Sequence, residues 1–303
     1  MSKQARQETV AFVGLGQMGG PMAENLLKKG HAVVVFDVDK RKVARFAELG
    51  AQAATGPADA ARQASVLISM VDTTAQAEDV IAGPDGFMQA AQPGDVVISM
   101  GTIDLMVLRR LHPTLQAKGV DLLDAPVTGM EKGAIEGTLN AYVGGDAAAL
   151  EKVRPVLASM ATTITHFGAI GQGLAMKLIN NMLFQVNRVL IMEGLALGAK
   201  AGLDPQQMFE TISGATGNSV AFQYSAPKIL KRDFEGIRMD ITFKDVELQT
   251  QLAKSLGMPM FIANAALQVY QMARAKGLGD KDAVSTIQLY EEWTGVPVEG
   301  RKP

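Results

Sequence analysis

Short apolar runs recur through the first half of the chain, with polar segments of helical length between the earlier ones. Each run is continuous rather than alternating, which is typical of strands buried on both faces of a parallel sheet. The strand candidates are Ala11–Leu15, Ala32–Phe36, Val66–Met70, Val96–Met100, Leu122–Asp124, Ala141–Val143 and Thr163–His166. The last of them follow one another closely, which predicts an added portion at the edge of the sheet.

The pattern changes after Gly168. From Gly173 to Lys200 apolar residues recur at helical spacing, and no strong breaker interrupts them before Gly202. Further helices are expected at Pro205–Ser213, Ser219–Leu230, Ile241–Ser255, Met260–Lys276 and Asp282–Trp293, separated by Gly, Pro and Asn. We therefore expect an α/β domain over residues 1–168 and an all-helical domain over residues 169–303, joined by the long helix.

A glycine-rich turn follows the first strand candidate and leads into a helix over Pro21–Lys29. In such a strand–turn–helix unit, Gly14 permits the tight turn, Gly16 lets the backbone approach a pyrophosphate, and Gly19 lets the helix pack closely on the strand. The helix N-terminus offers unpaired N–H groups to the phosphates. The expected cofactor-binding turn comprises Gly14, Leu15, Gly16, Gln17, Met18 and Gly19. The α/β domain is thus predicted to be a Rossmann-type doubly wound sheet that binds a dinucleotide.

Asp37 stands at the end of the second strand candidate. It follows the glycines by about 20 residues, where a carboxylate can hydrogen-bond both hydroxyls of the adenosine ribose and would repel a 2′-phosphate. NAD is therefore the expected cofactor. Lys40, Arg41 and Lys42 follow closely and could be recruited by a phosphate, so NADP stays open as the alternative.

Composition narrows the classes of function. The 303 residues are 48% hydrophobic with a net charge of −2 and no long basic run, which indicates about two globular domains and small-molecule partners rather than nucleic acid or a membrane surface. The polar start of the chain, residues 1–9, lacks the apolar core of a signal peptide, and no segment has about 18 uninterrupted apolar residues. A cytoplasmic location is expected.

No metal site is predicted. The chain has no cysteine, and its histidines, His31, His112 and His166, do not have the spacing of metal ligands. Each histidine is expected at a strand edge or in a loop rather than in catalysis.

Four blocks, in this order, resemble the β-hydroxyacid dehydrogenase family, which includes 3-hydroxyisobutyrate dehydrogenases and tartronate semialdehyde reductases. They are Phe12–Gly19, then Asp124–Gly129 with Gly133-Ala134 and Gly137-Thr138, then Gly173–Asn181, and finally Lys244-Asp245. The resemblance spans nearly the whole chain. It implies an NAD(P)-dependent oxidoreductase that assembles as a homodimer or homotetramer.

Lys177 and Asn181 carry the expected chemistry. They lie four apart on the long helix, so both project from one face, about 5–6 Å apart at Cβ. A lysine and an amide on an otherwise apolar helix are costly unless they face a wet cleft, which we expect at the domain junction. An ammonium there could protonate a carbonyl oxygen during hydride transfer. The resemblance aligns Lys177 with the family's catalytic lysine and Asn181 with its asparagine partner.

The segment Thr128-Gly129-Met130 is the expected substrate-binding loop. Its backbone N–H groups and the Thr128 hydroxyl can bind a carboxylate. The resemblance matches it to a Ser-Gly-Gly that holds the substrate carboxyl group. Met130 replaces the second glycine, so it either shapes the substrate site or is an apolar filler.

The resemblance also assigns Met70, Val71, Thr102 and Lys244 to the cofactor, with Lys244 closing over it. Two stretches depart from the family pattern: Met70-Val71-Asp72 replaces Leu-Pro, and Gly101 replaces the hydroxyl residue that commonly precedes the position of Thr102.

The predicted function is hydride transfer between NAD and a short 3-hydroxyacid or its semialdehyde or keto form, with Lys177 as general acid and base. An imine reductase shares this architecture but generally lacks a lysine at the Lys177 position. A phosphogluconate-type enzyme would require clustered cations for its substrate phosphate. A cofactor-binding module without turnover is the alternative from another class. The apolar stripe of the helical half independently predicts a homo-oligomer.

Overall fold

The computed structural model describes residues 9–300, and within this range a nine-stranded sheet forms the centre of the first of two compact units. The strands are β1 (Thr9–Val13), β2 (Ala32–Phe36), β3 (Gln52–Ala53), β4 (Val66–Ser69), β5 (Val96–Ser99), β6 (Asp121–Asp124), β7 (Val127–Thr128), β8 (Leu139–Gly144) and β9 (Ala161–Gly168). Their order is β3-β2-β1-β4-β5-β6-β8-β7, and β9 pairs with β8. The first six strands in this order are parallel, which is the arrangement of a Rossmann sheet. The predicted fold class is confirmed.

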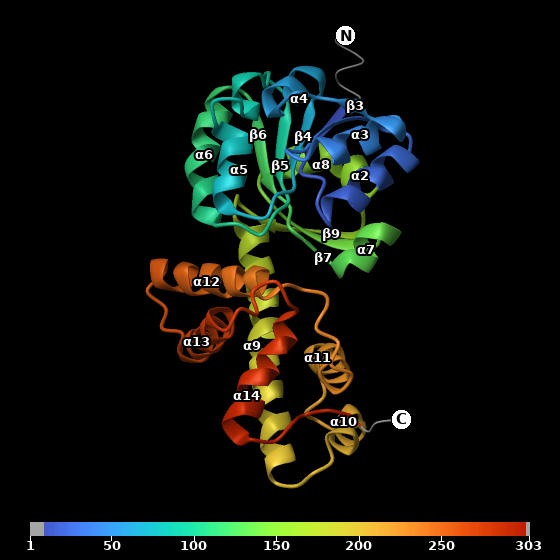
Figure 1. The fold of residues 1–303 in the computed structure, drawn as a ribbon. Coiled ribbons are helices and arrows are strands. Elements are labelled where there is room, and N and C mark those ends of the chain that lie inside the picture. The colour runs from blue at the N-terminus through green and yellow to red at the C-terminus, as the bar shows by residue number, and fades with distance from the viewer. Residues whose placement is uncertain (1–8, 301–303) are drawn as a thin grey trace. The chain divides into compact units, whose positions relative to one another are not determined.

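Helices cover both faces of this sheet. They are α2 (Gly19–Lys28), α3 (Lys40–Glu48), α4 (Pro57–Gln63), α5 (Thr74–Ala82), the 3₁₀ turn η1 (Phe87–Gln89), α6 (Leu105–Ala117), α7 (Met130–Glu136) and α8 (Ala147–Leu157). Figure 1 shows α5 and α6 on one face and α2, α3 and α8 on the other. Helices α3, α5, α6 and α8 each begin at a side-chain cap: Asp39, Thr73, Asp104 and Asp146. These caps explain why the helices start directly after the strands.

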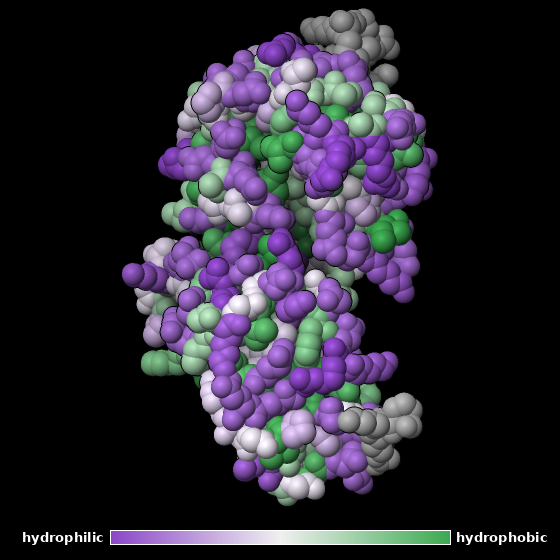
Figure 2. Space-filling view, viewed as in Figure 1, coloured by the Kyte–Doolittle hydropathy of each residue, from purple (hydrophilic) through white to green (hydrophobic). Residues whose placement is uncertain are grey.

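The core of the first unit lies where the sheet is covered on both faces. Phe12, Val35, Ile68 and Ile98, from four adjacent strands, are fully buried. On the visible face of this unit hydrophilic side chains predominate (Figure 2). The strands are continuously apolar because helices cover the sheet on both faces.

The predicted edge portion consists of β7, β8 and β9. Strand β8 is antiparallel to β6 and β7 and parallel to β9. The sequence did not predict β3, which has only two residues, or β7 and α7, which replace an expected loop after Thr128. These elements are too short for a periodic signal. Pairing with the longer strands β2 and β8 defines β3 and β7.

The second unit is helical throughout its described part, as predicted. It contains most of α9 (Gln172–Lys200), then α10 (Pro205–Ser213), α11 (Val220–Leu230), α12 (Met239–Ser255), α13 (Phe261–Ala275), the 3₁₀ turn η2 (Ala283–Thr286) and α14 (Ile287–Thr294). The single helix expected over Asp282–Trp293 is thus wrong, because this segment divides into η2 and α14. Asp282 accepts a hydrogen bond from the backbone N–H of Val284 at 2.9 Å and starts the 3₁₀ turn.

A buried ion pair lies in the middle of this helical unit. Arg188 of α9 pairs with Asp282, and both side chains are completely buried. The Arg188 guanidinium lies 5.5 Å from the centre of the Phe184 ring and 5.4 Å from that of Tyr224. Asp282 also accepts hydrogen bonds from the Tyr224 hydroxyl and the backbone of Ile237. One carboxylate therefore joins α9, α11 and the segment before α12.

Helix α9 belongs to both units, because the division falls between Lys177 and Leu178. The domain boundary predicted at residues 168 and 169 stays a prediction. By length and composition α9 could cross a membrane, and half of its most apolar window is buried within the protein. Residues 1–8, on which the expectation about a signal peptide rests, lie outside the described residues, and the cytoplasmic location stays a prediction.

The start of α9 is tied to the sheet by Asp124, the last residue of β6. The two oxygens of this buried carboxylate accept hydrogen bonds from the backbone N–H groups of Gly171 and Leu174, each at 2.6 Å. Burial raises the pKa of Asp124, and the two N–H groups oppose part of that rise. Because helix N-terminal N–H groups otherwise have no acceptor, this side chain determines where α9 begins.

We predict that Asp124→Asn lowers the free energy of unfolding by about 1–3 kcal/mol, because an amide has one acceptor oxygen and leaves one of these buried N–H groups without a partner. Urea unfolding would measure the change. Asp121→Asn, on the same strand but half-buried, is the control and should stay within about 0.5 kcal/mol. Equal effects of the two substitutions would contradict the capping role.

Candidate functional site

The predicted cofactor residues meet at one edge of the sheet. The glycine-rich turn follows β1, Asp37 follows β2, Met70-Val71 follows β4 and Thr102 lies shortly after β5. These strands are parallel and adjacent, so their carboxyl ends share an edge. The strand order reverses between β1 and β4, and doubly wound sheets bind their ligands at this reversal.

Close packing accounts for two of the three glycines in the turn. Gly14 has φ +98°, and a Cβ there would collide with the carbonyl group of Met70. A Cβ at Gly19 would collide with the carbonyl oxygen of Gly14. Around Gly16, by contrast, no atom of the described chain lies within 4 Å of the position of a Cβ. Gly16 therefore presents open backbone, as a pyrophosphate site requires.

Asp37 holds the turn in place. Its Oδ2 accepts a hydrogen bond from the backbone N–H of Leu15 at 2.7 Å, and its Oδ1 accepts one from Asp39 at 2.8 Å. Lys42 approaches Oδ2 at 3.7 Å. Each carboxylate oxygen has a further lone pair, so Asp37 can still accept a ribose hydroxyl. The residues present thus fit the adenosine end of a dinucleotide.

The first turn of α3 carries a second carboxylate. Asp39 forms a two-pronged pair with Arg41, with Nε–Oδ1 at 3.0 Å and Nη2–Oδ2 at 2.8 Å. These hydrogen bonds lower the pKa of Asp39 to about 2. The sequence identifies Lys40, Arg41 and Lys42 as possible phosphate ligands, but it does not identify Asp39 as the partner of Arg41.

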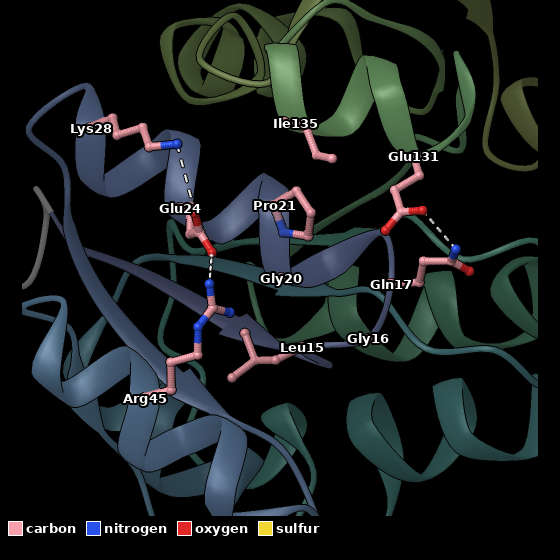
Figure 3. Close-up of a pocket in the computed structure, with 10 residues that line it drawn as sticks. All are labelled: Leu15, Gly16, Gln17, Gly20, Pro21, Glu24, Lys28, Arg45, Glu131 and Ile135. Carbon is pink, nitrogen blue, oxygen red and sulfur yellow. Dashed lines mark hydrogen bonds and ion pairs between the residues drawn. The ribbon is translucent and has the colours of Figure 1, made fainter.

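A cavity of about 380 Å³ adjoins the glycine-rich turn (Figure 3). Gln17 points toward Glu131 of α7 and donates a hydrogen bond to it at 2.8 Å. Glu24 of α2 pairs with Arg45 at 2.5 Å and with Lys28 at 3.6 Å. The cavity is lined by Leu15, Gly16, Gln17, Gly20, Pro21, Glu24, Lys28, Arg45, Glu131 and Ile135. It therefore connects the turn with α7 but does not reach Asp37 or Met70.

Gly101, one of the departures from the family pattern, has a structural reason. A Cβ at this position would collide with the carbonyl oxygen of Val71. The loops after β4 and β5 approach each other so closely that no side chain fits between them. Thr102 is half-buried beside this contact.

The structure brings Lys177 to the expected substrate loop. Its Nζ donates a hydrogen bond to the carbonyl oxygen of Val127 at 2.7 Å. Val127 directly precedes Thr128 and Gly129, which are half-buried. The ammonium group thus contacts the residue directly before the hydroxyl and backbone groups that could hold a carboxylate.

Met130 adopts an unusual backbone conformation. Its φ is +56°, and its side chain is 51% exposed. A left-handed residue other than glycine costs about 1–2 kcal/mol, which explains why a glycine is common here in the family pattern. The exposure excludes a buried apolar filler.

Asn181 and Lys244 lie in the second unit, where Asp245 connects them. Asp245 is 3% exposed, and its Oδ2 accepts hydrogen bonds from the amides of Asn181 at 2.8 Å and Gln185 at 3.1 Å. Lys244 approaches its Oδ1 at 3.3 Å. Gln249 donates to the Gln185 side chain at 2.8 Å. Asp245 stood in a family block, but only the fold reveals that it orients Asn181.

The histidines occupy structural positions. His31 contacts the Ser159 hydroxyl at 2.8 Å just before β2, and His166 of β9 contacts the carbonyl oxygen of Gly145 at 2.9 Å. Burial lowers the pKa of His31. His112 lies inside α6, so its expected place at a strand edge or in a loop is wrong.

Comparisons with known proteins match both units. The NAD-binding domain of 6-phosphogluconate dehydrogenase matches residues 9–168, and the NAD-binding region of NADP-dependent 3-hydroxyisobutyrate dehydrogenase matches residues 171–290. A 2-(hydroxymethyl)glutarate dehydrogenase from Eubacterium barkeri is 36% identical over 96% of this chain and 97% of the relative. The chain belongs to the β-hydroxyacid dehydrogenase family.

Other members of the β-hydroxyacid dehydrogenase family support this assignment. An NAD-dependent L-serine dehydrogenase from Pseudomonas aeruginosa is 34% identical over 94% of this chain and 99% of the relative. The solved structure of a Mycobacterium tuberculosis 3-hydroxyisobutyrate dehydrogenase with L-serine has a TM-score of 0.86 and 34% identity, over 93% of this chain and 99% of that chain. An imine reductase from Myxococcus stipitatus shares the fold alone, at 18% identity and a TM-score of 0.61. The predictions of an oxidoreductase and of a nicotinamide cofactor are confirmed.

We predict that Gly16→Ala lowers the affinity for NADH at least about 10-fold, because its methyl group enters the space that the pyrophosphate backbone would use. Fluorescence titration would measure the affinity, and thermal unfolding should show a stable protein because the methyl group meets no other atom of the described chain. Gly19→Ala is the matched control and should instead lower stability. Unchanged NADH affinity in Gly16→Ala would exclude this turn as the pyrophosphate site.

Proposed function

We propose that this β-hydroxyacid dehydrogenase family member transfers a hydride between NAD and a short 3-hydroxyacid or its semialdehyde or keto form. The observation that carries the proposal is the hydrogen bond of 2.7 Å from Lys177 Nζ to Val127, which puts a proton donor beside Thr128 and Gly129. The names of three relatives support a short 3-hydroxyacid or semialdehyde as the substrate: these relatives are described as acting on L-serine, 2-(hydroxymethyl)glutarate and 3-sulfolactaldehyde. Asp37 supports NAD, with NADP as the alternative.

Different residues bind the substrate and transfer the proton. The Thr128 hydroxyl and the Gly129 backbone hold the substrate carboxylate. The bound nicotinamide ring supplies or accepts the hydride. As a neutral amine, Lys177 accepts the proton of the substrate hydroxyl during oxidation, and as an ammonium it donates a proton to the carbonyl oxygen during reduction. Its hydrogen bond to Val127 fixes the direction of the ammonium group between turnovers.

Asn181 assists Lys177 through its orientation. Its amide N–H₂ group donates to Asp245 at 2.8 Å, and its oxygen accepts a long hydrogen bond of 3.4 Å from the neighbouring Asn180. The second lone pair of that oxygen can accept a hydrogen bond from Lys177 or from a substrate hydroxyl. Asp245 is therefore a positioning residue. Met130, with its exposed side chain next to Gly129, shapes the substrate end of the loop.

The contacts of Lys177 and Asn181 favour this function over an imine reductase and over a cofactor-binding module. An imine reductase shares the fold, but Lys177 is the residue that such enzymes generally lack. A cofactor-binding module without turnover would not require the pairing of Lys177 with Val127 or the part-buried Asn181–Asp245 contact.

We predict that Lys177→Met lowers kcat for the preferred 3-hydroxyacid by about 10²–10⁴-fold, because it removes the proton donor and acceptor. The affinity for NADH should stay within about two-fold, since the adenosine and pyrophosphate contacts remain. Absorbance at 340 nm would follow turnover on a panel of 3-hydroxyacids, semialdehydes and cyclic imines. Lys132→Met, an exposed lysine of α7 whose side chain is 83% exposed, is the control and should turn over normally.

Turnover that survives Lys177→Met would discard the lysine mechanism. Reduction of an imine alone would favour an imine reductase, and NADH binding without any turnover would favour the module.

We further propose that the chain assembles as a homodimer or homotetramer. Several large apolar side chains of α9 are exposed by 49–71%, at spacings of four and seven residues: Ile179, Leu183, Leu190 and Leu197. A stripe of this kind on one helix is typical of a surface that packs on another copy.

Sedimentation equilibrium should therefore give two or four times the mass of one chain, because burial of this stripe stabilises the assembly. Leu190→Glu should dissociate it, whereas Glu193→Gln, an exposed position on the same helix, should not. A monomer at micromolar concentration would contradict the proposal.

A further inference from the structure

Two carboxylates stand within three residues at the end of β2, and they have different partners. Asp37 accepts the backbone N–H groups of Leu15 and Asp39 and lies near Lys42. Asp39 instead accepts the backbone N–H of Arg41 at 3.0 Å and pairs with its side chain. The second carboxylate is therefore both the N-cap of α3 and the partner of an arginine.

Arg41 has the properties of a 2′-phosphate ligand. It follows the strand end where a ribose carboxylate discriminates NAD from NADP, and an arginine near that carboxylate is the group that accommodates a 2′-phosphate. Its side chain is 91% exposed, so solvent and ligands can reach it. A guanidinium group matches a phosphate with two parallel hydrogen bonds.

Those same donors are committed to Asp39. Nε and Nη2 of Arg41 are the two nitrogens that contact the carboxylate, at 3.0 and 2.8 Å. A phosphate that takes this edge of the guanidinium must displace Asp39, which leaves a second carboxylate beside Asp37. A ribose with two hydroxyl groups requires neither displacement nor a cation.

We propose that Asp39 is a specificity-determining residue that favours NAD over NADP by holding Arg41 in this two-pronged pair. The inference rests on the cofactor site of the proposed function and adds to it a second selectivity element besides Asp37. Asp37 accepts the ribose hydroxyls, and Asp39 withholds the guanidinium from a 2′-phosphate.

The test measures binding without catalysis. Isothermal titration of the full chain with 5′-AMP and with 2′,5′-ADP compares the adenosine ends of NAD and NADP. Asp39→Asn removes the charge and keeps an N-cap for α3. We expect it to raise the affinity for 2′,5′-ADP about 10-fold, since both a competing partner and a repelling charge are lost, and to leave 5′-AMP within about two-fold.

Matched variants separate the causes. In the double variant Asp39→Asn/Arg41→Ala, the gain over Arg41→Ala alone should be much smaller than in the wild-type background, because no guanidinium remains to be released and only the loss of the Asp39 charge acts. Asp59→Asn is the charge-matched control: its side chain is 27% exposed, compared with 28% for Asp39, and it lies near Arg62 on α4. It should change neither affinity.

No gain in Asp39→Asn, an equal gain in Asp59→Asn, or an undiminished gain in the double variant would overturn the proposal. Since neither probe undergoes hydride transfer, these results do not depend on whether the chain turns over a 3-hydroxyacid. A failure of turnover with the expected binding pattern would overturn the proposed function alone.

Discussion

The hydrogen bonds from the start of α9 to Asp124 are the constraint on which the proposed chemistry depends. They attach the helix to the end of β6 through Gly171 and Leu174. Lys177 lies one turn further along, where its ammonium group reaches the carbonyl oxygen of Val127. Val127 lies only three residues after Asp124. One short segment therefore accepts the hydrogen bonds from the first N–H groups of α9 and from the ammonium group of Lys177. Two neighbouring Gly residues keep the space clear: a Cβ at Gly144 would meet the Asp124 carboxylate, and one at Gly173 would meet the carbonyl group of Tyr142.

In the predicted cofactor site, close contacts between backbone segments fix the positions of the loops. The loops after β1, β4 and β5 approach one another so closely that Gly14 meets Met70 and Gly101 meets Val71. Contact between the loops requires glycine at these positions. Gly16 differs because its missing side chain leaves open space. The contrast separates a glycine that serves packing from one that serves binding, although all of them look alike in the sequence.

Buried carboxylates organise the helical unit. Asp282 neutralises Arg188 and joins three segments, and Asp245 orients Asn181 and Gln185. A buried ion pair is costly to desolvate, and removal of one partner leaves an uncompensated charge, so such pairs specify how helices meet. Asp245 also turns the oxygen of Asn181 away from itself, because it accepts the hydrogen bond of the Asn181 amide N–H₂ group. The same residue type therefore builds the core and orients the side chain of Asn181.

The sequence singled out Lys177, Asn181 and the glycine-rich turn as candidate site residues, with the roles of Lys177 and Asn181 implied by the family resemblance. By itself it determined the Rossmann sheet and the helical second half. These depend on local order along the chain, because periodicity and turn chemistry are read from neighbouring residues. The same reasoning could not find β3, β7 and α7, which have too few residues for a periodic signal, or the division of Asp282–Trp293, where a carboxylate committed to Arg188 starts a 3₁₀ turn. Only the tertiary structure decided the partners: Val127 for Lys177, Asp245 for Asn181, Met70 for Gly14. Such pairs join residues far apart in the chain, and their chemistry appears only when folding brings them within hydrogen-bonding or van der Waals distance.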